Sequence, residues 1–371
     1  MELVVRKNEF LRELQLFQGI VERKNTIPIL ANVLIEAKDS EVRMLATDLE
    51  VALRSRCDAS VAKGGSLTLP AKKLYEIIKA LPETDVRIDE DKNGVRVAAD
   101  RFDSRIQTLP REDFPTLPEA TGASRVVLPR DAVREMIAKT QFAITGEDTR
   151  YFLNGALFVL RSDSMSLVAT DGHRLALVSV ARGADAAAKD GEEAKAILPK
   201  KTLLELGKLL AESDGDIYYE RGENHLFFEV GGRMLISRMI DGQFPAYERV
   251  IPKGNDKEIE FERERLTNAV KRVALLSNER SRAVKFEIDK GRVEVTSSSS
   301  EFGEAREQIP VEYNGGAMAI SFNAQYVLDF LNVVGTDIVA LSLKDEVSQA
   351  VMKPVGAAGY DYTYVIMPMR I

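Results

Sequence analysis

The sequence predicts an α+β fold in which three similar domains each combine antiparallel sheets with two helices. Three observations predict it: an internal repeat of about 120 residues, helix-period stretches that alternate with strand-period stretches, and a globular composition. Of the 371 residues, 45% are hydrophobic and 29% are charged, as is typical of a folded protein. A chain of this length has room for two or three domains.

The repeat is visible in two pairs of similar strings. "ATD" at 46–48 returns at 169–171, and "LPAKKLYEIIKALPETD" from Leu69 resembles "LPKKTLLELGKLLAESD" from Leu198. A third and fainter copy begins near Lys257. Short polar connectors rich in turn-forming residues, "EATGAS" and "PKGNDK", separate the copies. We therefore expect three domains, at residues 1–122, 123–254 and 255–371.

Each copy opens with a short strand candidate and contains two helix candidates. The strand candidates are residues 2–5, 125–128 and 258–261. Leu74, Ile77, Ile78 and Leu81 follow the spacing of an amphipathic helix. The six expected helices are 6–14, 71–80, 130–139, 199–210, 263–272 and 323–333. Alternating runs with Asp-Gly, Gly-Gly and Asn-Gly turns predict antiparallel strands between them, and the segment 182–195, rich in alanine and acidic residues, predicts a solvated loop.

Positive charge is concentrated on the first five helix candidates. They carry a net charge of +9, although the whole chain has a net charge of −7. On a single helix, basic residues usually mark a solvated face, but five basic helices in an acidic chain favour one positive surface. Such a surface attracts the DNA backbone without reading the base sequence. The helices lack interleaved aromatic residues that would stack on bases, which favours duplex over single-stranded DNA.

Other features favour a cytoplasmic protein without a cofactor, a metal ion or a membrane partner. Cys57 is the single cysteine, which excludes an intrachain disulfide and a thiolate metal cluster. The start "MELVVRKNEF" lacks the apolar core of a signal peptide. No apolar run reaches the roughly 18 residues that a membrane span requires.

The string "ATDGHRLA" has the composition of an active site because it places Asp171, His173 and Arg174 together. In a strand, Asp171 and His173 would lie on the same face, which suits a base oriented by an acid. No serine or cysteine nucleophile motif accompanies them, so a turn residue and a binding-pocket residue are the stronger interpretations of His173. The other histidine, His225, follows Asn224 and is expected in an exposed hairpin turn.

Several longer strings, in order along the whole chain, resemble the bacterial sliding clamp family, the beta subunits of the replicative DNA polymerase. The resemblance implies a non-catalytic processivity subunit with the DNA clamp fold. In that fold, two three-domain chains join head to tail and close a ring around duplex DNA, with helices lining the hole. The strings are "TIPILANVLIEA" (26–37), "TRYFLNGALF" (149–158), "ATDGHRLA" (169–176), "DGQFPAYERVIP" (241–252), "LLSNERSRAV" (275–284) and "YVIMPMRI" (364–371).

The resemblance also implies a hydrophobic pocket between the second and third domains, where short peptide motifs dock. The ligands would be the replicative polymerase, the clamp loader, other polymerases and repair proteins. The two methionines of "VIMPM" offer adaptable apolar surface, whereas the string taken alone reads as a terminal core strand. Carried over by position, the pocket comprises Leu153, Thr170, Gly172, His173, Arg174, Leu175, Pro245, Arg249, Val250, Val365, Ile366, Met367, Pro368, Met369 and Arg370.

DNA contacts and dimer contacts follow from the resemblance in the same way. Two positions depart from the family: Glu147 replaces a neutral glutamine found in some relatives, and Phe152 lacks the hydroxyl of a tyrosine. The DNA-binding residues would be Lys24, Arg150, Tyr151 and Phe152, to which the basic helices add Lys72, Lys73, Lys200 and Lys201. The dimer contact would comprise Arg101, Arg105, Ile106, Leu275, Leu276, Glu301 and Glu304.

Two alternative functions stay open on the sequence alone. A DNA-processing hydrolase whose basic helices hold its substrate would need a set of metal-binding carboxylates, and no convincing set stands out in the sequence. A DNA-binding scaffold that does not form a ring would differ only in whether the protein closes on itself, and a single sequence does not show closure.

Overall fold

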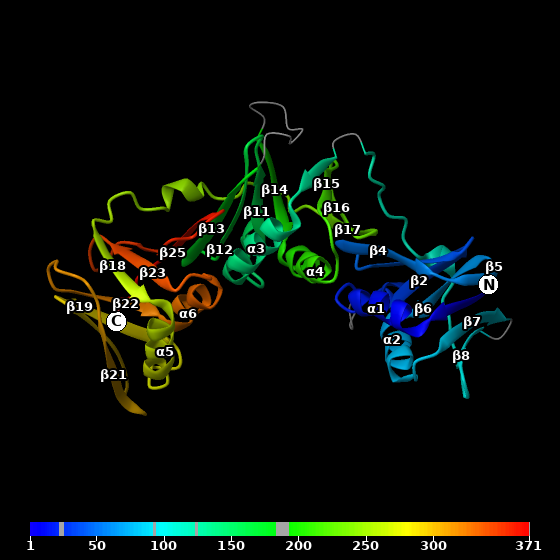
Figure 1. The fold of residues 1–371 in the computed structure, drawn as a ribbon, viewed down its shortest axis with the longest axis horizontal. Helices are drawn as coiled ribbons and strands as arrows, with labels where there is room; N and C mark the ends of the chain where they lie inside the picture. Colours follow the sequence, from blue (N-terminus) through cyan, green and yellow to red (C-terminus); the bar gives the residue numbers. More distant parts are fainter. Residues whose placement is uncertain (22–25, 92–93, 123–124, 183–192, 371) are drawn as a thin grey trace. The chain divides into compact units, whose positions relative to one another are not determined.

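The computed structural model describes residues 1–21, 26–91, 94–122, 125–182 and 193–370. They form two compact units: unit 1 is Met1–Asp131 with Lys201–Met239, and unit 2 is Ala132–Lys200 with Ile240–Ile371. The division passes through the middle copy of the repeat. Each unit contains one eight-stranded antiparallel sheet that continues from one copy into the next (Figure 1).

Unit 1 contains two antiparallel sheets, with α1 (Lys7–Phe17) and α2 (Ala71–Ala80) packed against them. The large sheet has the order β10-β15-β16-β17-β4-β3-β2-β6 and the small sheet the order β5-β1-β7-β8-β9. The large sheet comprises β2 (Asn32–Lys38), β3 (Glu41–Thr47), β4 (Val51–Asp58), β6 (Gly65–Pro70), β10 (Val126–Leu128), β15 (Ile217–Arg221), β16 (His225–Val230) and β17 (Arg233–Arg238). The small sheet comprises β1 (Glu2–Arg6), β5 (Ser60–Lys63), β7 (Asp85–Asp91), β8 (Gly94–Ala99) and β9 (Phe102–Ile106).

Unit 2 repeats this plan with α5 (Arg263–Ala274) and α6 (Ala324–Val333). Its large sheet has the order β14-β11-β12-β13-β25-β24-β23-β18 and its small sheet the order β21-β20-β19-β22. The large sheet comprises β11 (Gly155–Leu160), β12 (Ser164–Thr170), β13 (Arg174–Ala181), β14 (Ala194–Pro199), β18 (Lys257–Glu262), β23 (Ile338–Leu343), β24 (Ala350–Pro354) and β25 (Asp361–Ile366). The small sheet comprises β19 (Ala283–Asp289), β20 (Arg292–Ser299), β21 (Gly303–Pro310) and β22 (Met318–Asn323). Two further helices, α3 (Arg130–Thr140) and α4 (Lys200–Ala211), cross the unit boundaries.

The amphipathic patterns form helices whose apolar stripes are buried. In α1, Phe10, Leu14 and Phe17 are fully buried, as are Leu74 and Ile78 in α2. α1 lies beside α2 and α5 beside α6 (Figure 1). The six expected helices and the three opening strands are confirmed. The largest difference is at the end of α1, which extends three residues past the expected end because Phe17 continues the buried stripe.

Two local predictions differ from the structure. His225 is the first residue of β16, partly buried and opposite Arg238, so its assignment to an exposed turn is wrong. The strand begins one residue after Asn224 because the ladder with β17 extends to that point. Most of the loop expected at 182–195 lies outside the described residues, and its last two residues belong to β14.

Within the described ranges, no helix is both long and apolar enough to cross a membrane. Among the same residues, no group of three or more histidine, cysteine, aspartate or glutamate side chains is arranged to hold a metal ion.

Candidate functional site

The turn between β12 and β13 brings Asp171, His173 and Arg174 together. Asp171 Oδ1 accepts the main-chain N–H groups of His173 and Arg174 at 2.9 and 3.0 Å, as aspartate does in an Asx turn. Thr170 Oγ1 accepts the N–H of Gly172 at 3.1 Å and donates to the Arg174 carbonyl at 2.6 Å. Gly172 has a φ of +88°, where a side chain is unfavourable. The aspartate therefore builds a turn instead of orienting the His173 ring as a base.

The Arg174 guanidinium is held by three acceptors and two aromatic rings. Nε donates to Asp171 Oδ2 at 3.0 Å, Nη1 donates to Asp329 on α6, and Nη2 donates to the Phe142 carbonyl at 2.6 Å. The ring centroids of Tyr326 and Phe142 lie 4.2 and 5.3 Å from the guanidinium carbon, within cation–π range. The side chain is only 10% exposed. The sequence predicts a pocket residue at this position, but these donors are committed to the protein's own groups.

The C-terminal segment that follows β25 is bonded on both sides. The N–H of Met367 donates to the His173 carbonyl at 2.9 Å, so the segment is tied to the Asp171 turn. The N–H of Met369 donates to the carbonyl of Ser321 on β22 at 2.7 Å, which ties it to the small sheet of unit 2. These two bonds fix the path of Met367, Pro368 and Met369, which are expected in the peptide pocket.

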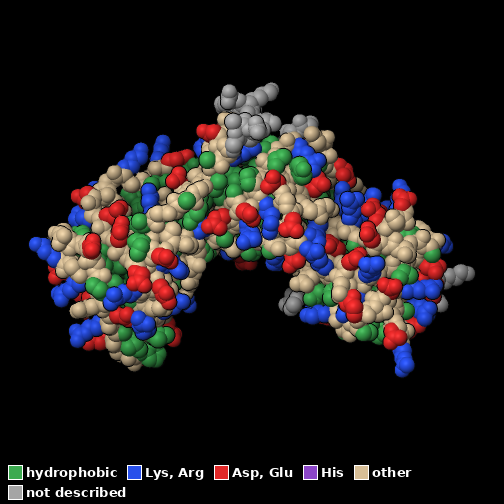
Figure 2. Space-filling model, viewed as in Figure 1, with side chains coloured by type: hydrophobic (Ala, Val, Ile, Leu, Met, Phe, Trp, Pro, Cys, Tyr) green, Lys and Arg blue, Asp and Glu red, His purple; other side chains and the backbone are tan. Residues whose placement is uncertain are grey.

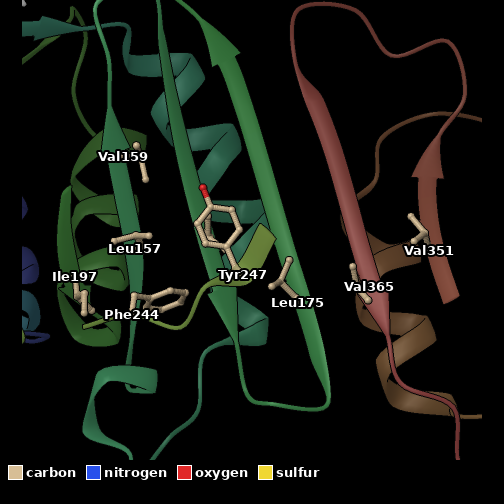
Figure 3. Close-up of a cluster of buried hydrophobic side chains, with 9 residues drawn as sticks. Leu157, Val159, Leu175, Ile197, Phe244, Tyr247, Val351 and Val365 are labelled. Atoms are coloured by element: carbon tan, nitrogen blue, oxygen red, sulfur yellow. The ribbon is translucent and has the colours of Figure 1, made fainter. Parts of the chain in front are cut away.

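A cluster of buried apolar side chains joins the large sheet of unit 2 to the segment that follows residue 240. Leu175 and Val365 lie opposite each other on the paired strands β13 and β25, and Phe244 and Tyr247 pack into the same cluster. Figure 3 shows Phe244 next to Leu157. The cluster comprises Leu157, Val159, Val168, Leu175, Ile197, Phe244, Tyr247, Val351 and Val365.

The residues expected to form the peptide pocket divide into a buried set and a surface set, all within unit 2. Val250 and Met367, each 37% exposed, are large apolar side chains of the surface set. The buried set is Leu153, Thr170, Leu175, Val365 and Ile366. The partly or fully exposed set is Gly172, His173, Arg174, Pro245, Arg249, Val250, Met367, Pro368, Met369 and Arg370.

The loop expected to touch DNA is anchored by an ion pair. Arg150 Nε and Nη2 donate to the Asp148 carboxylate at 3.0 and 2.8 Å, and these bonds lower the pKa of Asp148 to about 2. Tyr151 is 56% exposed, and its ring meets that of the partly buried Phe152 edge to face at 5.9 Å. Arg150 thus reaches the surface with its charge already paired. The fourth expected residue, Lys24, lies outside the described residues.

The lysines expected to add DNA contacts on α2 are exposed but share one carboxylate. The side chains of Lys72 and Lys73 are 52% and 65% exposed, and their Nζ atoms lie 3.8 and 2.7 Å from Glu76. Figure 2 shows cationic and anionic side chains interspersed over the visible face of the molecule. The positive charge expected of the helices is therefore offset locally at α2.

The two lysines at the start of α4 make contacts inside their own units. In unit 2, Lys200 Nζ donates to the carbonyl of Ile144 at 3.0 Å. In unit 1, Lys201 Nζ donates to the carbonyl of Ile20 at 3.0 Å and to Asp48 Oδ2 at 2.5 Å. Both ammonium groups stabilise the fold, a role that the charge count alone does not reveal.

The strands β9 and β21 occupy matching ends of the small sheets. In unit 1, β4 of the first copy pairs with β17 of the second copy, and in unit 2, β13 pairs with β25 of the third copy. Each pair joins the third strand after the first helix of one copy to the third strand after the second helix of the next copy. By the same rule β21 would pair with β9, and each lies at a sheet end without a second neighbour among the described strands.

Exposed apolar side chains accompany these two sheet ends. Phe102 on β9 is 40% exposed, Phe302 beside β21 is 50% exposed, and Leu275 after α5 is 78% exposed. Of the expected dimer residues, Arg105 pairs with Asp91 at 2.9 Å within the chain, whereas Ile106 is buried. Phe102 and Phe302 are not among the dimer residues expected from the sequence, although each directly follows an expected charged residue, Arg101 or Glu301.

Comparisons with protein families match the whole chain in order. The N-terminal, central and C-terminal domains of the DNA polymerase III beta subunit match residues 1–118, 127–246 and 248–370. The chain is 38% identical to a beta sliding clamp of Pseudomonas aeruginosa and 34% identical to one of Escherichia coli K12, with all of both chains covered in each case.

Solved structures give the same result at the level of the fold. A sliding clamp of Pseudomonas aeruginosa bound to griselimycin superposes with a TM-score of 0.94 at 37% identity, and a beta sliding clamp of Caulobacter crescentus, with polyethylene glycol bound, superposes with a TM-score of 0.92 at 34% identity. Both comparisons cover all of both chains.

Proposed function

The chain belongs to the DNA polymerase III beta subunit family, and we propose that two copies close head to tail into a ring around duplex DNA. A protein of this family is a non-catalytic processivity factor, a sliding clamp that tethers the replicative polymerase. In this proposal the domains are 1–122, 123–254 and 255–371, and the protein works in the cytoplasm. The observation that carries the ring is the strand rule of the two large sheets, which leaves β9 and β21 as the next pair.

Pairing of β9 in one copy with β21 in the other is a heterologous contact. It forms twice in a dimer and closes the two copies into a ring. The exposed side chains of Leu275, Phe102 and Phe302 supply its apolar part. Arg101, Arg105, Glu301 and Glu304 surround it, but exposed ion pairs contribute only about 0–1 kcal/mol each. The apolar residues therefore dominate the affinity between the two copies.

Replacing the apolar residues should separate the copies. The double variant Leu275→Ala and Leu276→Ala is expected to sediment as a monomer, because it removes the most exposed leucine of the contact. Arg105→Ala serves as a matched control, since its charge is already paired with Asp91 within the chain, and it should remain a dimer. A dimeric Leu275→Ala and Leu276→Ala protein would place the interface elsewhere.

The ring holds DNA topologically, with sequence-independent contacts from Arg150, Tyr151 and Phe152, from Lys24, and from the exposed lysines of α2. Without loading, the protein should bind DNA weakly, and its binding constant should fall as the salt concentration rises. A plot of the logarithm of the binding constant against the logarithm of the salt concentration should steepen by about 0.9 for each phosphate neutralised. The decisive experiment loads the protein onto nicked circular DNA with a clamp loader and then raises the salt. Retention on circles and loss after linearisation supports a ring. Equal loss from both would favour a scaffold that does not close.

The partners dock through short peptides in the pocket of unit 2, whose accessible apolar side chains include Val250 and Met367. Each fully buried apolar anchor of a peptide gains about 1.5–3 kcal/mol, and ordering the peptide subtracts from the total. A net binding free energy near −8 kcal/mol corresponds to about micromolar affinity. That affinity lets the replicative polymerase, the clamp loader, other polymerases and repair proteins exchange at one site.

A further inference from the structure

Helix α6 contacts the Asp171 turn of the pocket through the side chain of Arg174. We propose that Asp329, acting through Arg174, is a positioning residue that holds the C-terminal wall of the peptide pocket in place. The inference rests on the proposed function, because it assigns to α6 a role in the same peptide site.

The Asp329 carboxylate is fully engaged and mostly buried. Oδ2 accepts from Arg174 Nη1, and Oδ1 accepts from Gln325 Nε2 at 2.8 Å, one helical turn earlier on α6. The Asp329 side chain is 19% exposed. A charge-assisted bond in such surroundings is about twice as strong as a neutral one. Asp329 is thus held by its own helix and pointed at the guanidinium.

Aromatic residues prevent the guanidinium from moving to another partner. Tyr326 and Phe142 flank it, and the Phe142 ring meets the Tyr364 ring at 5.7 Å. The Tyr364 hydroxyl donates to the Tyr326 carbonyl at 2.9 Å, which ties β25 to α6 behind Arg174. The guanidinium therefore lies between two aromatic rings, with its charge paired to both Asp171 and Asp329.

Three hydrogen bonds carry this arrangement to the pocket wall. Arg174 holds Asp171 Oδ2, Asp171 Oδ1 holds the N–H of His173, and the His173 carbonyl holds the N–H of Met367. A shift of Arg174 would loosen the turn and then the segment that begins at Met367. A peptide that binds to a loosened wall must also order it, and that cost reduces its affinity.

The first copy of the repeat lacks this device. Its string "ATDLEV" places Val51 where "ATDGHR" places Arg174. The aspartate of that turn, Asp48, receives Lys201 instead. Of these two turns, both within the described residues, the one at the proposed peptide site is linked to a helix through an arginine.

The test measures the affinity for a fluorescently labelled polymerase tail peptide by anisotropy, together with hydrogen exchange at the Met367 amide. Asp329→Asn keeps the shape of the side chain and removes its charge. Arg174→Lys keeps the positive charge and removes the planar guanidinium with its several donors. Each is expected to raise the Kd about tenfold, the effect of one charge-assisted bond, and to speed exchange at Met367. Because both act on one path, the double variant should bind no worse than Arg174→Lys alone.

Asp289→Asn is the matched control, since it makes the same change in an exposed pair with Arg292 elsewhere in unit 2. It should leave the Kd and the exchange unchanged, and all variants should remain dimers in sedimentation. An unchanged Kd and unchanged Met367 exchange in a folded Asp329→Asn protein would overturn the inference. If the wild-type protein does not bind the peptide, the proposed pocket fails, and the exchange measurement alone then decides whether Asp329 positions the segment.

Discussion

Unit 1 and unit 2 each contain a junction at which one copy of the repeat pairs its edge strand with that of the next. Ala52 on β4 lies opposite Ile236 on β17, and Leu175 on β13 lies opposite Val365 on β25. Ala52 and Leu175 occupy the same position after "ATD" in their copies. Both junctions therefore pair this position across copies, over four residue pairs in unit 1 and six in unit 2, and their side chains differ.

The junction of unit 1 is held by a buried ion pair. Arg233 Nε donates to Glu13 Oε2 at 2.8 Å, and the two side chains are 8% and 7% exposed. The Ser55 hydroxyl donates to the same carboxylate, and Arg233 Nη1 donates to Ser213 Oγ at 2.8 Å. With these partners satisfied, the pair acts as a fixed internal link.

The connector after the first copy covers the other side chains of this junction. Leu117 and Ala120 pack against Phe227 and its cluster, and Arg54 donates to both carboxylate oxygens of Glu119 at 3.1 and 2.9 Å. A cavity of about 300 Å³ remains beside this connector. In unit 2 the corresponding region leaves Val250 and Met367 partly exposed. One junction is therefore closed by its own connector, and the other keeps apolar surface for a ligand.

The largest expected effect comes from breaking the ion pair of unit 1. Arg233→Ala leaves Glu13 buried without a cation, which should cost about 3–5 kcal/mol of unfolding free energy. The loss of unfolding free energy is measured by unfolding the protein in urea and monitoring hydrogen exchange in β4 and β17 of unit 1. Arg54→Ala is the matched control, since its pair with Glu119 is partly exposed and should cost no more than about 1 kcal/mol. Equal losses would show that burial does not distinguish the two pairs.

Cys57 on β4 reports on the same junction without a further substitution. Burial raises the pKa of its thiol to about 12, and the charges of Glu13 and Glu9 add to the effect. Since only the thiolate reacts, the wild-type protein should react with a thiol reagent at pH 8 at least about a hundredfold more slowly than a free cysteine. Arg233→Ala should speed this reaction because the weakened junction opens more often and exposes the thiol, although the uncompensated charge of Glu13 acts in the opposite direction. A fast reaction of the wild-type protein would show that Cys57 is not protected.

Removing residues 367–371 should abolish peptide binding at the junction of unit 2, while β13 and β25 remain paired. The affinity for the peptide is expected to fall at least about a hundredfold, close to 2.7 kcal/mol, because Met367 and Met369 form one wall. Anisotropy with the labelled peptide measures the loss, and sedimentation checks that the truncated protein is still a dimer. Undiminished binding would remove the C-terminal segment from the site.

The smallest effect compares the two turns. Leu49 has a φ of +78° and is 50% exposed, whereas the equivalent Gly172 has a φ of +88°. A residue with a side chain costs about 1–2 kcal/mol in this left-handed backbone conformation. Glycine avoids that cost but loses about 0.5–1 kcal/mol of stability, because its unfolded chain has more conformational entropy. Leu49→Gly should therefore stabilise unit 1 by about 0.5–1 kcal/mol in thermal unfolding. Gly172→Ala should instead destabilise unit 2. A change of stability in the same direction for both variants would refute the comparison.

Much of this architecture can be predicted from local patterns. The helices expected at 71–80 and 263–272 and the strands that open each copy follow from apolar spacing, because burial of one stripe or one face is a short-range constraint. The repeat itself indicates three similar domains, and the longer strings that include "YVIMPMRI" identify the family. These properties depend on residues that are close together in the chain.

The sequence by itself did not determine how those pieces are used, since that depends on contacts between distant residues. Arg174 was assigned to the pocket from the family resemblance, but Asp329, 155 positions away, engages its guanidinium. Lys201 was counted as free positive charge, although Asp48 takes it up. Tertiary structure alone decided which copies share a sheet and which junction stays accessible, because hydrogen-bonded strand edges and buried charges find partners in space, not in sequence order.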